Sequence, residues 1–344
     1  RITLKKISWK RLILFLKMNN EIPFVSIVIP VRNVEKILGR CLESLKVLDY
    51  PKDKYEVIIA DSESNDNTPS IAKKYGVIFI STSKKSVCAG RNEGFKITKG
   101  EIIAFSDADC VMDRNWIKNS LKYFADPKVG AVGGPNLSPA DDTAFAKAVS
   151  FIFDRALFSA GSVHGRVLKN TKVVASLPGC NIILRRKVLD GVMPVDETII
   201  GGEDFAMNYK IRKLGYKLLY TPDTFVWHYH RATPRKFFKQ IYRYGASRLI
   251  IGKKDIKMIN PVHIAVGFGI PVLLGIFLLL LFFNQIMLAW LMSTAALFFL
   301  VYIFLAWFKL NSLKAALWVP GVITILFCSW SLGFLRELIL PLKE

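Results

Sequence analysis

Short apolar runs alternate with amphipathic segments through the first third of the chain. The run at 24–31 (FVSIVIPV) is rich in β-branched residues and predicts a buried strand. Similar runs predict three more strands, at 55–60, 77–80 and 101–105. Segments with the composition of helices lie between them, at 35–48, 68–75 and 89–98. This alternation indicates an α/β domain with a mostly parallel sheet and helices on both faces, whose ligands bind beyond the carboxyl ends of the strands.

From about residue 258 the pattern changes, and the chain becomes almost wholly apolar. Three segments without Asp, Glu, Lys or Arg are long enough to cross a bilayer, at 262–283, 286–308 and 315–335. Only Asn284 and Gln285 separate the first two, so we expect a tight helical hairpin. A buried helix pair of a soluble protein is the alternative, which uncharged runs of this length disfavour.

Basic residues indicate the orientation of these segments. They precede the first segment and follow the second, at Lys253, Lys254, Lys257, Lys309 and Lys314. The positive-inside rule then predicts an integral protein of the plasma membrane with its large domain in the cytoplasm. Three full crossings would leave the C-terminal end outside, which the basic residues near that end disfavour. The third segment is therefore expected to cross, or else to be re-entrant or tilted.

The composition adds a formal charge of +21, from 48 Lys and Arg against 27 Asp and Glu. Residues 1–20 hold six basic residues and no acid, interleaved with apolar ones, which predicts a basic amphipathic helix on the membrane surface. A solvated arm is the alternative. We therefore expect membrane lipids as partners and no nucleic acid. The predicted organisation is this helix, an α/β domain over 24–250 and a membrane region over 258–344.

The five cysteines are scattered along the chain, without a CxxC pair or a cluster of His and Cys in the sequence. Their spacing therefore indicates neither a zinc site nor a disulfide framework.

Two carboxylates, Asp107 and Asp109, come directly after the strand predicted at 101–105. Such a pair at a strand end can share Mg²⁺ or Mn²⁺, which would neutralise charge on a departing nucleoside diphosphate. A lone DxD also marks ordinary polar loops.

Asp61 and Arg91 are candidates for contact with a nucleotide. Asp61 ends the strand at 55–60, where a carboxylate could accept the ring N–H of uracil or guanine, and a turn or helix cap is the alternative. Arg91, in AGRNEG near the start of a predicted helix, suits a diphosphate. A surface arginine is its alternative.

The motif GGEDFAMNYKIRKLGY places Glu203 and Asp204 in the first turn of a predicted helix. Asp204 is a candidate general base that takes a proton from an acceptor hydroxyl. Acids are also favoured there in any helix, by the helix dipole.

The segment WHYHRATPRK holds two of the four histidines, His228 and His230. Either could complete a metal site, and a packed histidine is the alternative. Arg231 could contact the leaving phosphates or lipid headgroups.

Six segments occur in order across roughly residues 25–235: VSIVIPVRN, ADSESNDNT, AGRNEG, FSDADC, GCNIILRR and GGEDFAMNYKIRKLGY. Together they resemble family 2 glycosyltransferases, an inverting group with the GT-A fold, which is the Rossmann-like fold of nucleotide-diphospho-sugar transferases.

The resemblance implies roles for particular residues. It implies a nucleotide-sugar contact for Pro30, Arg32, Asp61, Arg91 and Asp107. Asp109 and His228 would bind Mn²⁺ or Mg²⁺, and Arg231 would contact the diphosphate. Gly179, Asn181 and Glu203 would line the sugar and acceptor site, and Asp204 would be the catalytic base.

Two departures narrow the expectation. The PxYNE motif of dolichol-phosphate-mannose synthases is replaced by a sequence in which Glu35 comes one position later, and the QxxRW string of processive polysaccharide synthases is missing. We therefore expect non-processive transfer.

The expected donor is a UDP- or GDP-sugar, and the expected acceptor is a lipid-linked saccharide. A polyprenyl (dolichyl)-phosphate sugar synthase is the alternative, and its ionised acceptor would leave Asp204 a positioning role. A non-catalytic membrane-surface binding protein is a further alternative, which the intact set of acids disfavours.

Overall fold

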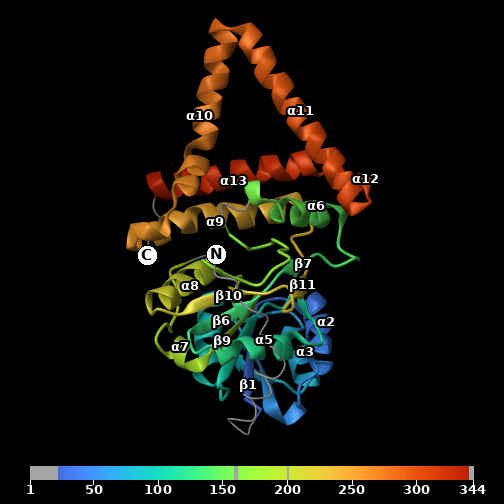
Figure 1. Ribbon diagram of the computed structural model, residues 1–344, viewed down its shortest axis with the longest axis vertical. Coiled ribbons are helices and arrows are strands. Elements are labelled where there is room, and N and C mark those ends of the chain that lie inside the picture. Colours follow the sequence, from blue (N-terminus) through green and yellow to red (C-terminus); the bar gives the residue numbers. More distant parts are fainter. Residues whose placement is uncertain (1–21, 159–161, 200, 341–344) are drawn as a thin grey trace. The chain divides into compact units, whose positions relative to one another are not determined.

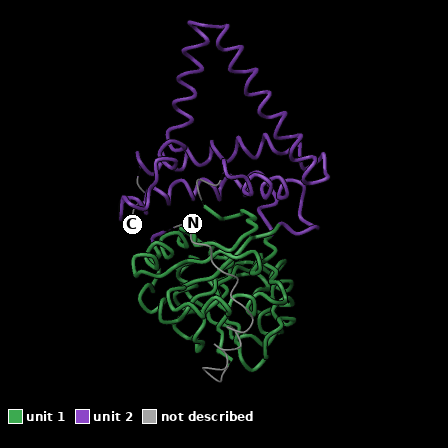
Figure 2. The backbone as a smooth tube through the Cα atoms, viewed as in Figure 1, with its two compact units in different colours: residues 1–137, 162–197, 203–228 green, residues 138–161, 198–202, 229–344 purple. Residues whose placement is uncertain are grey.

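The computed structural model describes residues 22–158, 162–199 and 201–340, which form two compact units (Figure 2). The first unit comprises residues up to 137, 162–197 and 203–228, and the second comprises 138–161, 198–202 and 229–344. The helix predicted over 1–20 lies outside the described residues. The domain boundaries predicted from composition stay a prediction. By its contacts, the segment 138–161 belongs to the same unit as the C-terminal helices.

The first unit is built on an eight-stranded sheet, in the order β3-β2-β1-β4-β9-β6-β10-β8 (Figure 1). The strands are β1 (Val25–Val31), β2 (Tyr55–Asp61), β3 (Ile78–Ser81), β4 (Ile102–Ser106), β6 (Val129–Gly133), β8 (Lys172–Val174), β9 (Asn181–Arg185) and β10 (Lys217–Tyr220). Neighbours among β1 to β4 are parallel, whereas β9 and β8 run antiparallel to their neighbours. The predicted mostly parallel α/β sheet is confirmed.

Helices cover both faces of this sheet. They are α2 (Glu35–Lys46), α3 (Thr68–Lys74), α4 (Val87–Lys96), α5 (Trp116–Leu121), α7 (Arg186–Asp190) and α8 (Glu203–Lys213). Side chains of a strand point alternately to the two faces. Ile27 and Ile29 therefore pack in one core with Leu38 of α2, while Val28 packs in the other with Met207 of α8. The four strands and three helices predicted over 24–105 lie within two residues of the expected bounds.

Helix α4 packs closely on β1 because two glycines face the strand. A Cβ at Gly90 would lie 2.8 Å from Cβ of Pro30, and one at Gly94 would overlap the side chain of Val28. These glycines are one turn apart and share a face of the helix. The close approach brings Arg91, next to Gly90, to the carboxyl end of the sheet.

A second, three-stranded sheet in the same unit has the order β5-β11-β7. It consists of β5 (Cys110–Met112), β7 (Asn136–Leu137) and β11 (Val226–His228). Strand β11 is antiparallel to β5, with His228 directly opposite Cys110. This pairing joins segments more than a hundred residues apart and places His228 beside Asp109 of the DxD segment.

The second unit is helical. Its helices are α6 (Ala144–Phe153), α9 (Pro234–Lys254), α10 (Pro261–Phe283), α11 (Gln285–Leu310), α12 (Leu313–Ala316) and α13 (Val319–Ile339). Within the described residues, three helical stretches are long and apolar enough to cross a membrane, at 261–283, 285–310 and 313–339. Helices α10 and α11 are joined by the predicted turn at Asn284, but they diverge from it and form an open hairpin instead of a tight one (Figure 1).

The third stretch differs from the hairpin in its packing. Helix α13 lies alongside α9, with Gly245 against the backbone of Trp330, Gly333 against that of Tyr242, and Lys253 Nζ 2.9 Å from Glu337 Oε1. Helix α9 carries seven Lys and Arg and no acid, a charge that hydrocarbon does not accommodate. Because α13 follows this charged helix along its length, we expect it to lie near the membrane surface and only α10 and α11 to cross.

Cysteine labelling tests this topology. In a Cys328→Ser background in vesicles, Asn284→Cys at the hairpin turn and Leu340→Cys after α13 are expected to react with an impermeant maleimide from opposite sides of the membrane. Cys88 is buried and serves as the unreactive internal control. Labelling of both positions from the same side would show three crossings and contradict the expectation.

Candidate active site

The site begins where the parallel strands end. Strand β1 ends at Val31, which pairs with Asp61 at the end of β2. Exposed Arg32 follows β1, and Asp107 follows β4. Pro30 lies within β1, so four of the predicted nucleotide-sugar contacts lie on or directly after adjacent strands, at the carboxyl edge of the sheet.

Asp61 is buried, with an exposed fraction of 2%. Its Oδ2 accepts a hydrogen bond from the Ser64 amide at 2.9 Å, and its Oδ1 accepts one from the Ser64 hydroxyl at 2.5 Å. The carboxylate therefore closes the turn after β2, which is the alternative role that the sequence offered for Asp61. Its contact with a base stays a prediction.

Arg91 is at the centre of the site and is not a surface arginine, since its side chain is only 2% exposed. Its Nη1 donates to Glu203 Oε1 at 2.6 Å, and its Nη2 donates to Asp107 Oδ1 at 3.2 Å. Burial opposes the charge of the guanidinium, but Glu203, Asp107 and Asp204 outweigh burial and raise the pKa of Arg91. The guanidinium thereby ties α8 to the DxD segment; its predicted contact with the nucleotide-sugar stays a prediction.

Asp204 is held by the loop before β9. Its Oδ2 accepts a hydrogen bond from the Gly179 amide at 2.9 Å, and its side chain remains 15% exposed. A Cβ at Gly179 would lie 2.8 Å from Arg91 Nη2 and 3.0 Å from Cβ of Asp204. Only glycine therefore fits between the proposed base and the central arginine.

We expect Gly179→Ala to lower kcat by about 10²-fold, since a displacement of about 1 Å at a catalytic group costs that much. Steady-state transfer kinetics measure the effect. Gly191→Ala is the matched control, because the one close contact of its new methyl group would be with the end of the Leu214 side chain, at 3.0 Å, and the carbonyl oxygen of Val188 would lie at an ordinary 3.7 Å. Equal kcat for the two variants would contradict this account of Gly179.

His164 is a residue that sequence reasoning missed. Its Nδ1 lies 3.7 Å from Asp204 Oδ2, and its Nε2 lies 3.1 Å from Ser176 Oγ. Asn208 Nδ2 also donates to that hydroxyl, at 3.0 Å. The only sequence signal was the scarcity of histidine, because the surrounding segment has no strong helical or strand pattern.

The two predicted metal ligands lie together: His228 Nε2 is 3.3 Å from Asp109 Oδ1. Carboxylate oxygens with one imidazole fit Mn²⁺, and the oxygens also suit Mg²⁺. The charge of the site fits too, because three carboxylates, those of Glu203, Asp107 and Asp204, surround the single positive charge of Arg91. These residues would therefore hold a divalent cation.

The residues that follow His228 belong to the second unit. His230 packs on Phe153, with ring centroids 6.0 Å apart, as the packed-histidine alternative proposed. Arg231 is exposed, and its diphosphate contact stays a prediction.

Asn181 is fully buried and joins three segments. Its Oδ1 accepts from Trp116 Nε1 at 2.8 Å, and its Nδ2 donates to the carbonyls of Pro135 and Thr224 at 3.2 and 3.1 Å. The structure thus gives Asn181 a structural role. That Asn181, Gly179 and Glu203 line the sugar and acceptor site stays a prediction.

Comparison with known families agrees with this fold. The family model described as glycosyl transferase family 2 matches residues 26–193, which span β1 to β9 and include the DxD segment. Residues 26–193 of this chain therefore form a glycosyltransferase family 2 domain. The resemblance to family 2 glycosyltransferases that its six motifs indicated is confirmed, and the protein is an enzyme of the transferase class.

Two curated relatives of this family 2 glycosyltransferase come from archaea. It is 29% identical over 247 residues to the dolichyl N-acetyl-alpha-D-glucosaminyl phosphate 3-beta-D-2,3-diacetamido-2,3-dideoxy-beta-D-glucuronosyltransferase of Methanococcus voltae, covering 67% of this chain and 74% of the relative. It is 28% identical over 247 residues to glycosyltransferase AglE of Haloferax volcanii, covering 69% and 77%.

A solved structure supports the fold. The mannosyltransferase PcManGT from Pyrobaculum calidifontis, solved in complex with GDP-Man and Mn²⁺, has a TM-score of 0.65 and 18% identity, with 95% of this chain and 94% of that chain covered. The predicted GT-A fold with C-terminal apolar helices is confirmed.

Proposed function

We propose that this family 2 glycosyltransferase moves a sugar from a UDP- or GDP-sugar to a lipid-linked saccharide, one sugar at a time and with inversion of the anomeric centre. The observation that carries the proposal is the cluster of Asp204, Glu203 and Asp107 around buried Arg91 at the carboxyl edge of the sheet. This is the edge at which α/β sheets bind nucleotides.

Asp204 takes the proton of an acceptor hydroxyl. The hydroxyl oxygen then forms a bond to the anomeric carbon while the bond from that carbon to the nucleoside diphosphate breaks. Attack opposite the leaving group inverts the configuration. The Gly179 amide, 2.9 Å from Asp204 Oδ2, orients the base, and Arg91 holds Glu203 beside it.

Mn²⁺ or Mg²⁺ at Asp109 and His228 would neutralise charge on the leaving diphosphate. Asp61 would contact the base, and Pro30, Arg32 and Asp107 the rest of the nucleotide-sugar. Gly179 and Asn181 would line the sugar site, and Arg231 would meet the diphosphate.

The nature of the acceptor is supported by the Methanococcus voltae relative, whose name describes transfer to position 3 of a sugar on dolichyl phosphate. An acceptor of that kind presents a neutral hydroxyl and needs a base. We accordingly favour a lipid-linked saccharide over a free polyprenyl phosphate.

The proposed location is the cytoplasmic face of the plasma membrane. The apolar hairpin of α10 and α11 would anchor the chain, and the basic residues of α9 would contact anionic headgroups. Each basic residue near such a surface contributes about 1 kcal/mol.

A transfer assay on the full chain in nanodiscs tests the proposal. Radiolabelled UDP- and GDP-sugars are supplied with Mn²⁺, together with polyprenyl-linked saccharide or polyprenyl phosphate. Label on the saccharide, with the opposite anomeric configuration from the donor, is expected. Label only on polyprenyl phosphate would show the synthase alternative. Transfer to neither, with no thermal shift from any nucleoside diphosphate, would favour a non-catalytic protein.

A further inference from the structure

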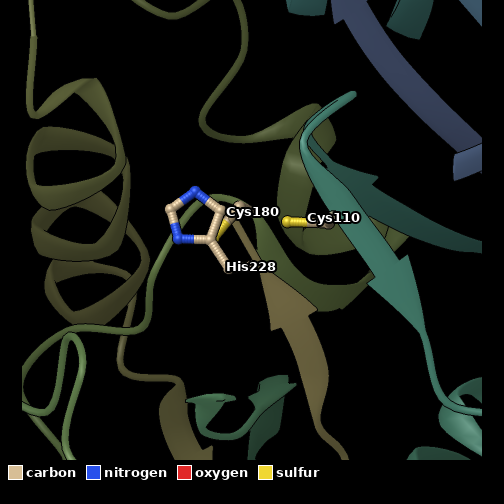
Figure 3. Close-up of side chains that lie close together, drawn as sticks. All are labelled: Cys110, Cys180 and His228. Carbon is tan, nitrogen blue, oxygen red and sulfur yellow. The ribbon is translucent and has the colours of Figure 1, made fainter. Parts of the chain in front are cut away.

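Two thiols and an imidazole lie together beside Asp109. Sγ of Cys110, Sγ of Cys180 and a ring nitrogen of His228 lie within 4.8 Å of one another. Figure 3 shows the two sulfur atoms and the imidazole side by side. The strand register brings them together, because His228 pairs opposite Cys110 and the pairing of Ser106 with Asn181 places Cys180 at the end of β4.

We propose that Cys110, Cys180 and His228 bind a thiophilic divalent cation such as Zn²⁺, and that this ion inhibits the enzyme by occupying His228. The site itself is independent of the proposed function, and only the inhibition rests on it.

The geometry suits zinc after a small adjustment. Tetrahedral zinc holds sulfur at about 2.3 Å and nitrogen at about 2.0 Å, so its ligand atoms lie about 3.5–3.8 Å apart. The three ligand atoms now lie up to 4.8 Å apart, so side-chain rotations must bring them about an ångström closer to one another. Binding would release two thiol protons to the buffer. Asn136 Nδ2, 3.1 Å from Cys180 Sγ, is placed to donate to the resulting thiolate.

Access and coordination follow from burial. Cys110 and Cys180 are 1% and 7% exposed, whereas the His228 side chain is 15% exposed, so an ion would enter past the imidazole. Zinc sites with three protein ligands leave a fourth position for water or substrate.

Competition arises because one histidine serves two sites. His228 Nε2 lies 3.3 Å from Asp109 Oδ1, and a ring nitrogen of the same histidine lies within 4.8 Å of the two thiol sulfurs. A neutral imidazole has one acceptor nitrogen, so it ligates one ion at a time. Thiolates select zinc and carboxylates select magnesium or manganese, and zinc therefore removes a ligand from the harder ion.

Cobalt binding tests the site without any activity. The full chain in detergent, freed of metal, is titrated with Co²⁺ while thiolate-to-cobalt charge transfer is followed in the near ultraviolet. The wild type and the Cys88→Ala control, which lacks a different buried cysteine, are expected to show the band. Cys180→Ala is expected to lose most of it, and Zn²⁺ to displace it from the wild type. No band in the wild type, or the same band in Cys180→Ala, would overturn the site.

X-ray absorption of the zinc-loaded wild type avoids any risk that a variant misfolds. Two sulfur neighbours at about 2.3 Å are expected, and none would overturn the site. In the transfer assay with Mn²⁺, Cys180→Ala is expected to need about tenfold more Zn²⁺ for half-inhibition, since even outer-shell changes cost 10–100-fold in metal affinity. If the wild type and Cys180→Ala were equally sensitive to Zn²⁺ while the cobalt titration gave the expected result, the proposed inhibition would be overturned and the metal site would stand. Absence of transfer in every sample would instead count against the proposed function.

Discussion

Replacing Asp204 by asparagine is expected to lower kcat for a hydroxyl acceptor by about 10²–10⁴-fold, while KM for the donor changes little. The amide oxygen of asparagine can still accept the hydrogen bond from Gly179, so the loop before β9 keeps its anchor. The amide cannot take a proton at neutral pH, so the chemical step loses its base. Steady-state kinetics with a lipid-linked saccharide measure both parameters.

The matched control is Asp190→Asn, which makes the same chemical change at an exposed position of α7. It is expected to keep the kcat of the wild type. Near-normal turnover of Asp204→Asn on a hydroxyl acceptor would refute the role of base. Normal turnover confined to polyprenyl phosphate would instead agree with an acceptor that arrives ionised.

The second large effect is expected on stability, from Arg91→Met. Methionine fills much of the volume but leaves Glu203, 14% exposed, without the cation 2.6 Å away. Removing one partner of a buried ion pair costs about 3–5 kcal/mol. Hydrogen exchange of the α4 amides in the full chain measures the free energy of opening of this helix.

A double variant separates the charge from the packing. Arg91→Met combined with Glu203→Gln is expected to recover part of the loss, because the carboxylate nearest to the lost guanidinium is then replaced by a neutral amide. Arg114→Met changes an exposed arginine and is expected to shift the free energy by less than about 0.5 kcal/mol. A loss below about 1 kcal/mol in Arg91→Met, or no recovery in the double variant, would show that the pair is not what holds α8 to the DxD segment.

Local patterns predicted the elements of the first third of the chain well. The β-branched run at 24–31 became β1, and each amphipathic segment that followed became a helix on one face of the sheet. The reason is that a strand buried on both faces reads as a short continuous apolar run, whereas a helix buries every third or fourth residue, so neighbouring residues carry the signal. The antiparallel direction of β8 and β9 was not predicted, since direction depends on the path of the chain.

The chemistry was visible from sequence as residue types at strand and helix ends. Asp107, Asp109 and Asp204 were predicted because polar groups after buried strands, and acids in a first helical turn, stand out against an apolar background. Their partners did not stand out. Arg91 had a surface position as its alternative, and only the glycine-mediated packing of α4 on β1 buries it between Glu203 and Asp107.

By itself, then, the sequence determined the α/β sheet, the apolar hairpin, the family and the acids at the strand ends. Tertiary structure alone decided that Cys110, Cys180 and His228 lie together and that His164 lies beside Asp204. It also decided that α13 packs along the charged helix α9. The physical reason is the same in each case. Hydrophobic periodicity records which side of an element is buried, whereas these contacts depend on register and packing between segments far apart in the chain.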